Sequence, residues 1–239
     1  MTKAVLVVRS SLFWVGFALS ILVFSLLSPI QFLFSERFNR KIVRSWGFVN
    51  LWWLRITCNL TYQIQGKEHL PNQAVVIISN HQSTFETLIF PRLIDRVTWV
   101  IKRELLLVPF FGWGLFHTKP IAINRKDGRS SVAQIKQLGK ERLDDGISIV
   151  IFPEGTRLNA NAQVPYKAGG GILATHAEVP VLPVAHNAGF FWPRHSFLKY
   201  PGVVTFSIGP LIDTKGLSTS EVTQQAQTWI EAERKRLPR

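Results

Sequence analysis

Cysteine is almost absent from the 239-residue sequence. Cys58 is the single one, which excludes an internal disulfide framework and any metal site built from several thiolates. Acidic residues are also few, since 15 Asp and Glu stand against 28 Lys and Arg, giving a formal net charge of +13. This excess predicts a polyanionic partner. At this level nucleic acid, an anionic membrane face and a phosphorylated substrate all remain open.

Charged side chains are missing altogether from residues 10–35, SSLFWVGFALSILVFSLLSPIQFLFS. As a helix this segment would be about 39 Å long, against a hydrocarbon core of roughly 30 Å. It is too long for the apolar part of a secretory signal peptide, and no small-residue cleavage site follows it. Pro29 is expected to end or kink the helix near Ser28, so the segment either spans the bilayer or enters one leaflet.

The next segment, residues 37–59, combines an apolar stripe with a basic face. Its apolar side chains recur at steps of three and four, as on one face of a helix: Phe38, Ile42, Trp46, Val49, Trp53 and Ile56. The other face carries Arg37, Arg40, Lys41 and Arg44. This pattern is typical of a helix at a lipid–water interface, and an ordinary core-packing helix is the alternative.

These basic residues outnumber Lys3 and Arg9 on the other side of the apolar segment, which predicts that the bulk of the protein is cytoplasmic. We therefore expect residues 1–59 to anchor the protein in the cell membrane (inner or cytoplasmic), by a transmembrane helix or within one leaflet. Contact with lipid then accounts for much of the basicity, which weakens the nucleic-acid interpretation and favours a membrane surface as partner.

Residues 60–239 alternate short apolar runs with amphipathic ones. This alternation predicts one α/β domain with a mainly parallel central sheet flanked by helices. Predicted strands cover residues 60–65, 74–79, 97–102, 120–123, 147–152, 181–185 and 203–208. Predicted helices cover residues 83–94, 130–145, 168–177 and 218–237. The last helix starts with a capping box, Ser218 and Glu221.

Three common catalytic templates do not occur: the G-x-S-x-G elbow, the G-x-x-x-x-G-K-[ST] loop and the H-E-x-x-H pair. The run GGGILA at residues 169–174 formally fits a dinucleotide fingerprint. No strand leads directly into it, so we interpret the match as chance.

The block NHQSTFE at residues 80–86 follows a strand and opens a helix, the position where open α/β sheets usually carry ligands. Glu86 would lie in the first turn of that helix and fold back towards His81. A carboxylate there fixes the imidazole tautomer and stabilises the imidazolium that forms when His81 takes a proton. Alone, the pair is more simply explained by a histidine that ends a strand and a glutamate that caps a helix.

A second block, FPEGTR at residues 152–157, also follows a strand. Gly155 permits close backbone approach, Thr156 offers a hydroxyl, and Arg157 has the fork of donors that fits phosphate. Glu154 belongs to the same turn, and Lys167 follows within reach. The block therefore predicts an anion-binding loop, and a polar turn with a solvated arginine is the alternative.

Two further blocks contain KREL, VPFFGWG and INR (residues 102–105, 108–114 and 123–125), and then VPVLPVAHN at 179–187. Lys102 and Arg125 each follow an apolar strand, which predicts that they share one sheet edge with His81 and Arg157. Several cations beside one histidine–carboxylate pair are costly unless an anion binds there. The aromatic loop fits core packing or an acyl or membrane contact, and the two prolines indicate an edge strand.

These four blocks, in this order and spacing, resemble those of the glycerolipid acyltransferases, in particular the 1-acylglycerol-3-phosphate O-acyltransferases. The resemblance covers roughly residues 66–210, and FPEGTR makes it specific. One departure is Glu86, where the family usually has Asp. Glu has the same charge as Asp, and its extra methylene lengthens the reach of the carboxylate towards His81.

The resemblance implies acyl transfer from a thioester, acyl-CoA or acyl carrier protein, to the sn-2 hydroxyl of lysophosphatidate, giving phosphatidic acid for phospholipid biosynthesis. His81 would be the base and Glu86 its partner. The acceptor phosphate would be held by Lys102, Arg125, Glu154, Gly155, Thr156 and Arg157, with Lys167 as a further contact. No metal or bound cofactor is implied. Glycerol 3-phosphate, another lysophospholipid or a lyso-aminolipid is the alternative acceptor, and a non-catalytic basic membrane protein is the alternative from another class.

Overall fold

A single sheet organises the protein, as seen in the computed structural model, which describes residues 2–124 and 127–238. Seven strands belong to it within those residues, in the order β1-β7-β6-β2-β5-β3-β4. Their bounds are β1 (Leu60–Gln65), β2 (Val76–Ser79), β3 (Val97–Lys102), β4 (Ile121–Ile123), β5 (Ser148–Ile151), β6 (Val181–His186) and β7 (Gly202–Ile208). Each lies within a residue or two of a strand predicted from the sequence.

Five neighbouring strands, β6, β2, β5, β3 and β4, run parallel to one another. β7 is antiparallel to β6 and parallel to β1. The prediction of a mainly parallel α/β sheet is therefore confirmed. Since the five strands share one direction, their carboxyl ends lie at one edge, where His81, Lys102 and the FPEGTR loop follow β2, β3 and β5.

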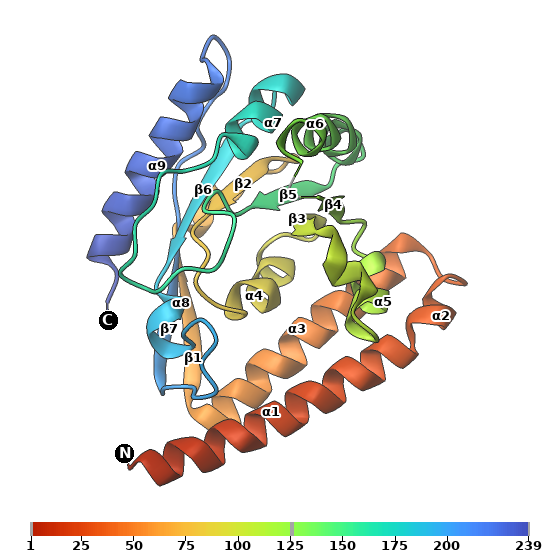
Figure 1. Ribbon diagram of the computed structural model, residues 1–239, viewed down its shortest axis with the longest axis vertical. Helices are drawn as coiled ribbons and strands as arrows, with labels where there is room; N and C mark the ends of the chain where they lie inside the picture. The colour runs from red at the N-terminus through yellow and green to blue at the C-terminus, as the bar shows by residue number, and fades with distance from the viewer. Residues whose placement is uncertain (1, 125–126, 239) are drawn as a thin grey trace.

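Helices cover both faces of the sheet (Figure 1). One face packs against α6 (Gly128–Asp144), α7 (Gly169–Ala177) and α9 (Thr219–Arg236). The glycine run predicted to be a chance match lies in α7, where a Cβ on Gly171 would be 2.4 Å from Thr223 Oγ1 of α9. These glycines therefore serve close helix packing. The predicted capping box, Ser218 with Glu221, is present at the start of α9.

The other face packs against α4 (Phe85–Leu93) and the N-terminal helices α1 (Lys3–Leu26) and α3 (Glu36–Cys58). The short helix α2 (Ser28–Gln31) joins α1 to α3. α1 ends at Leu26 and Pro29 lies in the first turn of α2, as the expected break at Pro29 requires. Short helical elements complete the chain: η1 (Lys67–His69), η2 (Arg103–Leu107), α5 (Phe111–Phe116) and α8 (Ala188–Phe191).

The N-terminal helices share a hydrophobic core with the sheet. Phe13 of α1 and Leu54 of α3 are fully buried in the same cluster as Phe85 and Phe206. A buried lysine strengthens the attachment, because Lys199 Nζ lies 4.1 Å from the ring centroid of Trp14 and donates to backbone carbonyls of its own loop. α1 is therefore docked on the α/β domain along its length.

Much of α1 and α3 nevertheless remains exposed. α1 is the one helix of the described chain that is long and apolar enough to cross a membrane. It exposes apolar side chains all along its outer side, for example Val8, Val15 and Leu19. α3 is helical as predicted, but its buried side is Gly47, Asn50, Leu51, Leu54, Thr57 and Cys58. Part of the predicted stripe, including Phe38, Val49 and Ile56, is exposed.

Candidate active site

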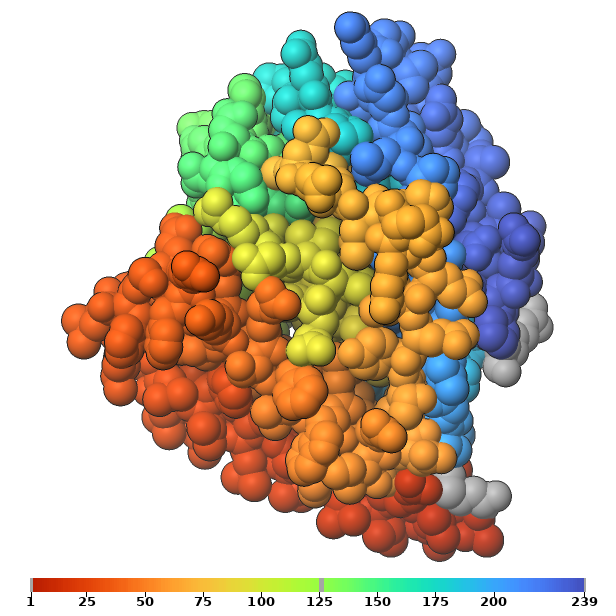
Figure 2. Space-filling view, turned by 180° about the vertical axis from the view of Figure 1, so that it is seen from behind, coloured from red at the N-terminus to blue at the C-terminus, as the bar shows by residue number. Residues whose placement is uncertain are grey.

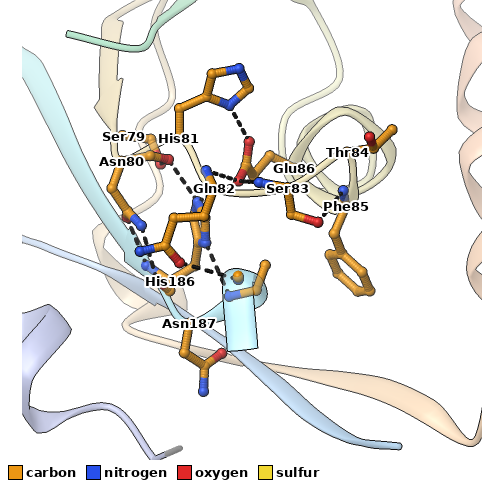
Figure 3. A network of polar contacts seen from close by, with 12 residues as sticks. Ser79, Asn80, His81, Gln82, Ser83, Thr84, Phe85, Glu86, His186 and Asn187 are labelled. Atoms are coloured by element: carbon orange, nitrogen blue, oxygen red, sulfur yellow. Dashed lines mark hydrogen bonds and ion pairs between the residues drawn. The ribbon is translucent and has the colours of Figure 1, made fainter. Parts of the chain in front are cut away.

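His81 and Glu86 meet where β2 ends and α4 begins. Nδ1 of His81 lies 2.5 Å from Oε2 of Glu86, and the imidazole stacks on Phe152 with ring centroids 4.0 Å apart. Figure 3 shows the other ring nitrogen pointing away from this network. The carboxylate thus holds Nδ1 as a proton donor and leaves Nε2 as the free base.

The second oxygen of Glu86 is equally well held. Oε1 accepts hydrogen bonds from the backbone N–H groups of Gln82 (2.7 Å) and Ser83 (2.6 Å), just ahead of α4. Burial of this carboxyl favours its neutral form, but His81, His186 and the hydrogen bonds that it accepts outweigh burial and lower the pKa of Glu86. Glu86 therefore stays a carboxylate although it is fully buried.

A second histidine, which the sequence did not single out, lies behind Glu86. His186 ends β6, is buried, and places Nε2 3.2 Å from Oε1 of Glu86. Asn80 holds it in place, because its side-chain amide exchanges two hydrogen bonds with the backbone of His186. The signal in the sequence was the VPVLPVAHN block. Its strand, β6, lies between β7 and β2, so the edge position predicted from its two prolines is wrong.

The FPEGTR loop is bound to the backbone of His81 on both sides. Oε2 of Glu154 accepts from His81 N at 2.6 Å, and Leu158 N donates to His81 O at 2.8 Å. Burial raises the pKa of Glu154 to about 8, against the opposing effects of that hydrogen bond and of Arg234. Glu154, predicted to contact phosphate, lies against His81 instead of facing out with the cations.

Gly155 has φ +74°, in the left-handed region that favours glycine. A Cβ there would lie 2.6 Å from Lys167 Nζ, so the side chain of Lys167 crosses this turn. Thr156 is exposed at its tip. The predicted neighbourhood of Gly155 and Lys167 is therefore present.

Arg157 differs from Lys102, because its partly buried guanidinium has no acidic partner within 4 Å among the described residues. Its Nε is buried without a hydrogen-bond partner there. Burial, and more weakly the nearby Arg194, lowers the pKa of Arg157, while Glu86 raises it. Lys102 is exposed at the end of β3, 3.4 Å from Glu104. Arg125, the remaining predicted cation, lies outside the described residues.

An apolar cavity of about 170 Å³ opens beside His81. His81 and Phe152 line it at the carboxyl edge of the sheet, and Gln31, Val43 and Thr118 line it near α2. Its walls combine α1, α3, β3 and α5, through Ile21, Phe24, Ile42, Trp46, Ile101, Phe111 and Leu115. The site thus has a free imidazole nitrogen that borders an apolar cavity, and an unpaired guanidinium on the next strand end.

A protein-family model described as Acyltransferase matches residues 61–187, which contain His81, Glu86 and Arg157. The chain is also 38% identical over 230 residues to the 1-acyl-sn-glycerol-3-phosphate acyltransferase of Pseudomonas aeruginosa, covering 93% of this chain and 89% of that protein. The chain belongs to the acyltransferase family.

Other relatives of this acyltransferase agree. The alpha form of the mouse enzyme, 1-acyl-sn-glycerol-3-phosphate acyltransferase, is 29% identical over 170 residues, which are 70% of this chain and 60% of the mouse protein. The crystal structure of PlsC, the 1-acyl-sn-glycerophosphate (LPA) acyltransferase of Thermotoga maritima, has a TM-score of 0.69 at 21% identity. It covers 94% of this chain and 97% of that one, which confirms the fold.

Neither Ser83 nor Cys58 is suitably placed as a nucleophile in the acyltransferase. Ser83 is buried and its Oγ accepts from Phe85 N, while Cys58 is buried at the end of α3. Burial raises the pKa of the Cys58 thiol. Within the described residues there is also no group of three or more His, Cys, Asp or Glu that could hold a metal ion.

Proposed function

We propose that the protein transfers an acyl chain from a thioester to the sn-2 hydroxyl of 1-acyl-sn-glycerol 3-phosphate, giving phosphatidic acid. The observation that carries this proposal is the His81–Glu86 pair, whose free Nε2 opens onto an apolar cavity. The names of the relatives support the same acceptor.

In this reaction Nε2 of His81 takes the proton of the acceptor hydroxyl as its oxygen attacks the thioester carbonyl carbon. Glu86 stabilises the imidazolium that results. The C–S bond then breaks, and the proton on His81 passes to the departing thiolate. The new ester and the free thiol leave directly, with no acyl group on the enzyme.

The acceptor phosphate would bind Arg157, with Lys102 at the end of the neighbouring strand β3. Arg125 is expected from the sequence to take part as well. The guanidinium of Arg157 favours this role, since it carries a buried donor without a partner among the described residues. Holding the phosphate would orient the sn-2 hydroxyl against His81, which is a large part of the rate advantage of a positioned reaction.

The apolar cavity would receive an acyl chain, with the thioester at His81 and the chain end near Gln31 and Val43. Acyl-CoA and acyl carrier protein are both suitable donors for such a pocket. The exposed apolar side of α1, together with its docking on α3, favours helices that lie in the cytoplasmic leaflet of the cell membrane, where a lipid acceptor can reach the site.

The test is thiol release by the purified protein with a panel of donors and acceptors. We expect turnover with lysophosphatidate, and much less with glycerol 3-phosphate or a lyso-aminolipid. His81→Ala should abolish release while the protein stays folded and membrane-bound. Preference for an acceptor without phosphate would refute the acceptor assignment, and full activity of His81→Ala would refute the mechanism.

A further inference from the structure

A second cavity, of about 220 Å³, lies away from His81. Arg96 and Val97 at the start of β3 and Ile147 at the start of β5 form one wall. Because these strands are parallel, this is the amino edge of the sheet, opposite the catalytic edge. We call it the amino-edge cavity. Its other wall is the first part of α3. Figure 2, the view from behind, shows the outer surface of this part of the chain in orange.

The amino-edge cavity is positively charged. Of the described residues that line it, four are Arg or Lys and two are acidic: Arg40, Arg44, Arg96 and Lys119, with Glu36 and Asp95. Each carboxylate is shared between two cations. Asp95 lies between Arg44 and Arg40, and Glu36 lies between Lys119 and Arg96. Two positive charges are therefore left in excess.

The carboxylates also lie on the outer side of this cluster, since their side chains are 60% and 50% exposed, against 28% for Arg40. The Nε atoms of Arg40 and Arg96 are buried and make no hydrogen bond with the described residues, although Nε of Arg40 lies 3.6 Å from Oδ2 of Asp95. Buried donors of this kind are normally satisfied. The unsatisfied N–H of Arg96 and the weakly paired N–H of Arg40, in a cavity of net positive charge, fit an anion with several acceptor oxygens, such as a phosphate.

The rim of the cavity is apolar. Phe32 and Phe116 line it, are more than half exposed, and lie with ring centroids 5.9 Å apart. Beyond them the exposed apolar surface continues over the turn before α3 and over η2 and α5, with Leu33, Phe34, Leu107 and Trp113. A soluble phosphate would use none of this surface, whereas a phospholipid has a phosphate and an adjoining apolar tail.

We propose that the amino-edge cavity binds the phosphate of an anionic phospholipid from the surrounding membrane, at a site separate from the acceptor phosphate at Arg157. Val43 and Thr118 line both cavities. A lipid bound here therefore packs directly behind the acyl pocket and fixes α3 against the start of β3. Its binding should stabilise the folded protein whether or not acyl transfer takes place.

The test is thermal unfolding of the full-length protein in a neutral detergent, titrated with dihexanoyl phosphatidylglycerol. We expect the midpoint to rise with lipid for the wild type. In Arg40→Gln/Arg96→Gln the apparent affinity should fall by at least about ten-fold. Arg37→Gln/Lys41→Gln is the matched control, because it removes two charges from the exposed part of α3, outside the cavity, and should bind as the wild type does.

Two further titrations identify the ligand. Glycerol 3-phosphate should stabilise much less than the lipid, and dihexanoyl phosphatidylcholine hardly at all. Repeating the lipid titration with Arg157→Ala distinguishes binding in the amino-edge cavity, which should persist in this variant, from binding at the acceptor site. Equal loss in both double variants, or equal effects of the lipid and of glycerol 3-phosphate, would overturn the proposal. Should Arg40→Gln/Arg96→Gln not fold, each single substitution leaves the neighbouring carboxylate paired and should weaken binding by part of the same factor.

Discussion

Nε2 of His186 lies 3.2 Å from Oε1 of Glu86 and 2.7 Å from the carbonyl oxygen of Asn80. Both neighbours are acceptors, so Nε2 carries the proton. Nδ1 in turn accepts from Ala188 N at 3.3 Å. Burial lowers the pKa of His186, with Glu86 acting in the opposite direction. His186 is thus neutral, donates its Nε2–H to Asn80 O, and lies beside the oxygen of Glu86 that does not face His81.

Replacing His186 by Phe should therefore lower kcat about ten-fold and leave KM for the acceptor nearly unchanged, because the polar N–H beside the positioned carboxylate and its hydrogen bond to Asn80 O are lost. Phe keeps most of the ring packing against Phe206. Steady-state thiol release measures both constants. His176→Phe, at an exposed position of α7, is the control. A rise in KM with kcat intact would show that His186 shapes the acceptor site instead.

The charge and length of Glu86 can be tested separately. Glu86→Gln keeps the volume but removes the charge that stabilises imidazolium, and we expect kcat to fall by roughly a hundred-fold or more. Glu86→Asp keeps the charge but shortens the reach to Nδ1 of His81, so a smaller loss of about ten-fold is expected. If Asp were fully active, the contacts of Oε1 with Gln82 and Ser83 would be dispensable.

The fold was largely predictable because its signals are local. Strand β3 and the capped start of α9 depend on apolar runs and on a Ser–Glu pair, and both occur where predicted. The short helices α5 and α8 were not predicted. α5 contains two glycines in six residues and begins after Phe110 at φ 63°, so tertiary contacts rather than propensity determine it.

The site was predictable only as far as single strand ends reveal it. His81 and Glu86 are five residues apart and meet as expected. The contact of His186 with Glu86 joins residues 100 positions apart, and no local pattern encodes it. No local pattern encodes the contribution of α1 to the acyl pocket either, where Ile21 and Phe24 form part of the wall. A boundary at residue 59 between anchor and domain stays a prediction.

Arg157 provides a test of acceptor recognition. Arg157→Ala should reduce kcat/KM for lysophosphatidate by about ten- to hundred-fold, the value of one or two charge-assisted hydrogen bonds. Arg157→Lys should recover only part, since an ammonium cannot reproduce the fork. Arg194→Ala tests whether the neighbouring cation contributes. An acceptor without phosphate serves as control, and equal losses on both acceptors would make Arg157 structural.

Glu154 should make stability depend on pH. Its pKa of about 8 in the folded protein lies above the ordinary value of 4.5, so the folded state holds a proton that the unfolded state releases. The contribution of Glu154 to the free energy of unfolding is complete below about pH 4.5. It is lost as the pH rises through 8, by at most about 1.4 kcal/mol per pH unit. Between pH 5 and pH 9 the midpoint of thermal unfolding should fall more steeply for the wild type than for Glu154→Gln. Glu141→Gln, at an exposed site on α6, should follow the wild type, and parallel curves for all three would contradict the shift.

Val43 offers a test of the acyl pocket, because it lines the end away from His81 and also borders the amino-edge cavity. Val43→Trp should fill that end and shorten the space for an acyl chain. We expect kcat/KM for long-chain thioesters to fall about ten-fold or more, since an overfilled apolar site costs roughly 1–3 kcal/mol. Short-chain thioesters, which do not reach Val43, should react at the wild-type rate. Val49→Trp places the same side chain on an exposed position of α3 and should change neither. If Val43→Trp slowed short and long chains alike, the cavity would not be the acyl site.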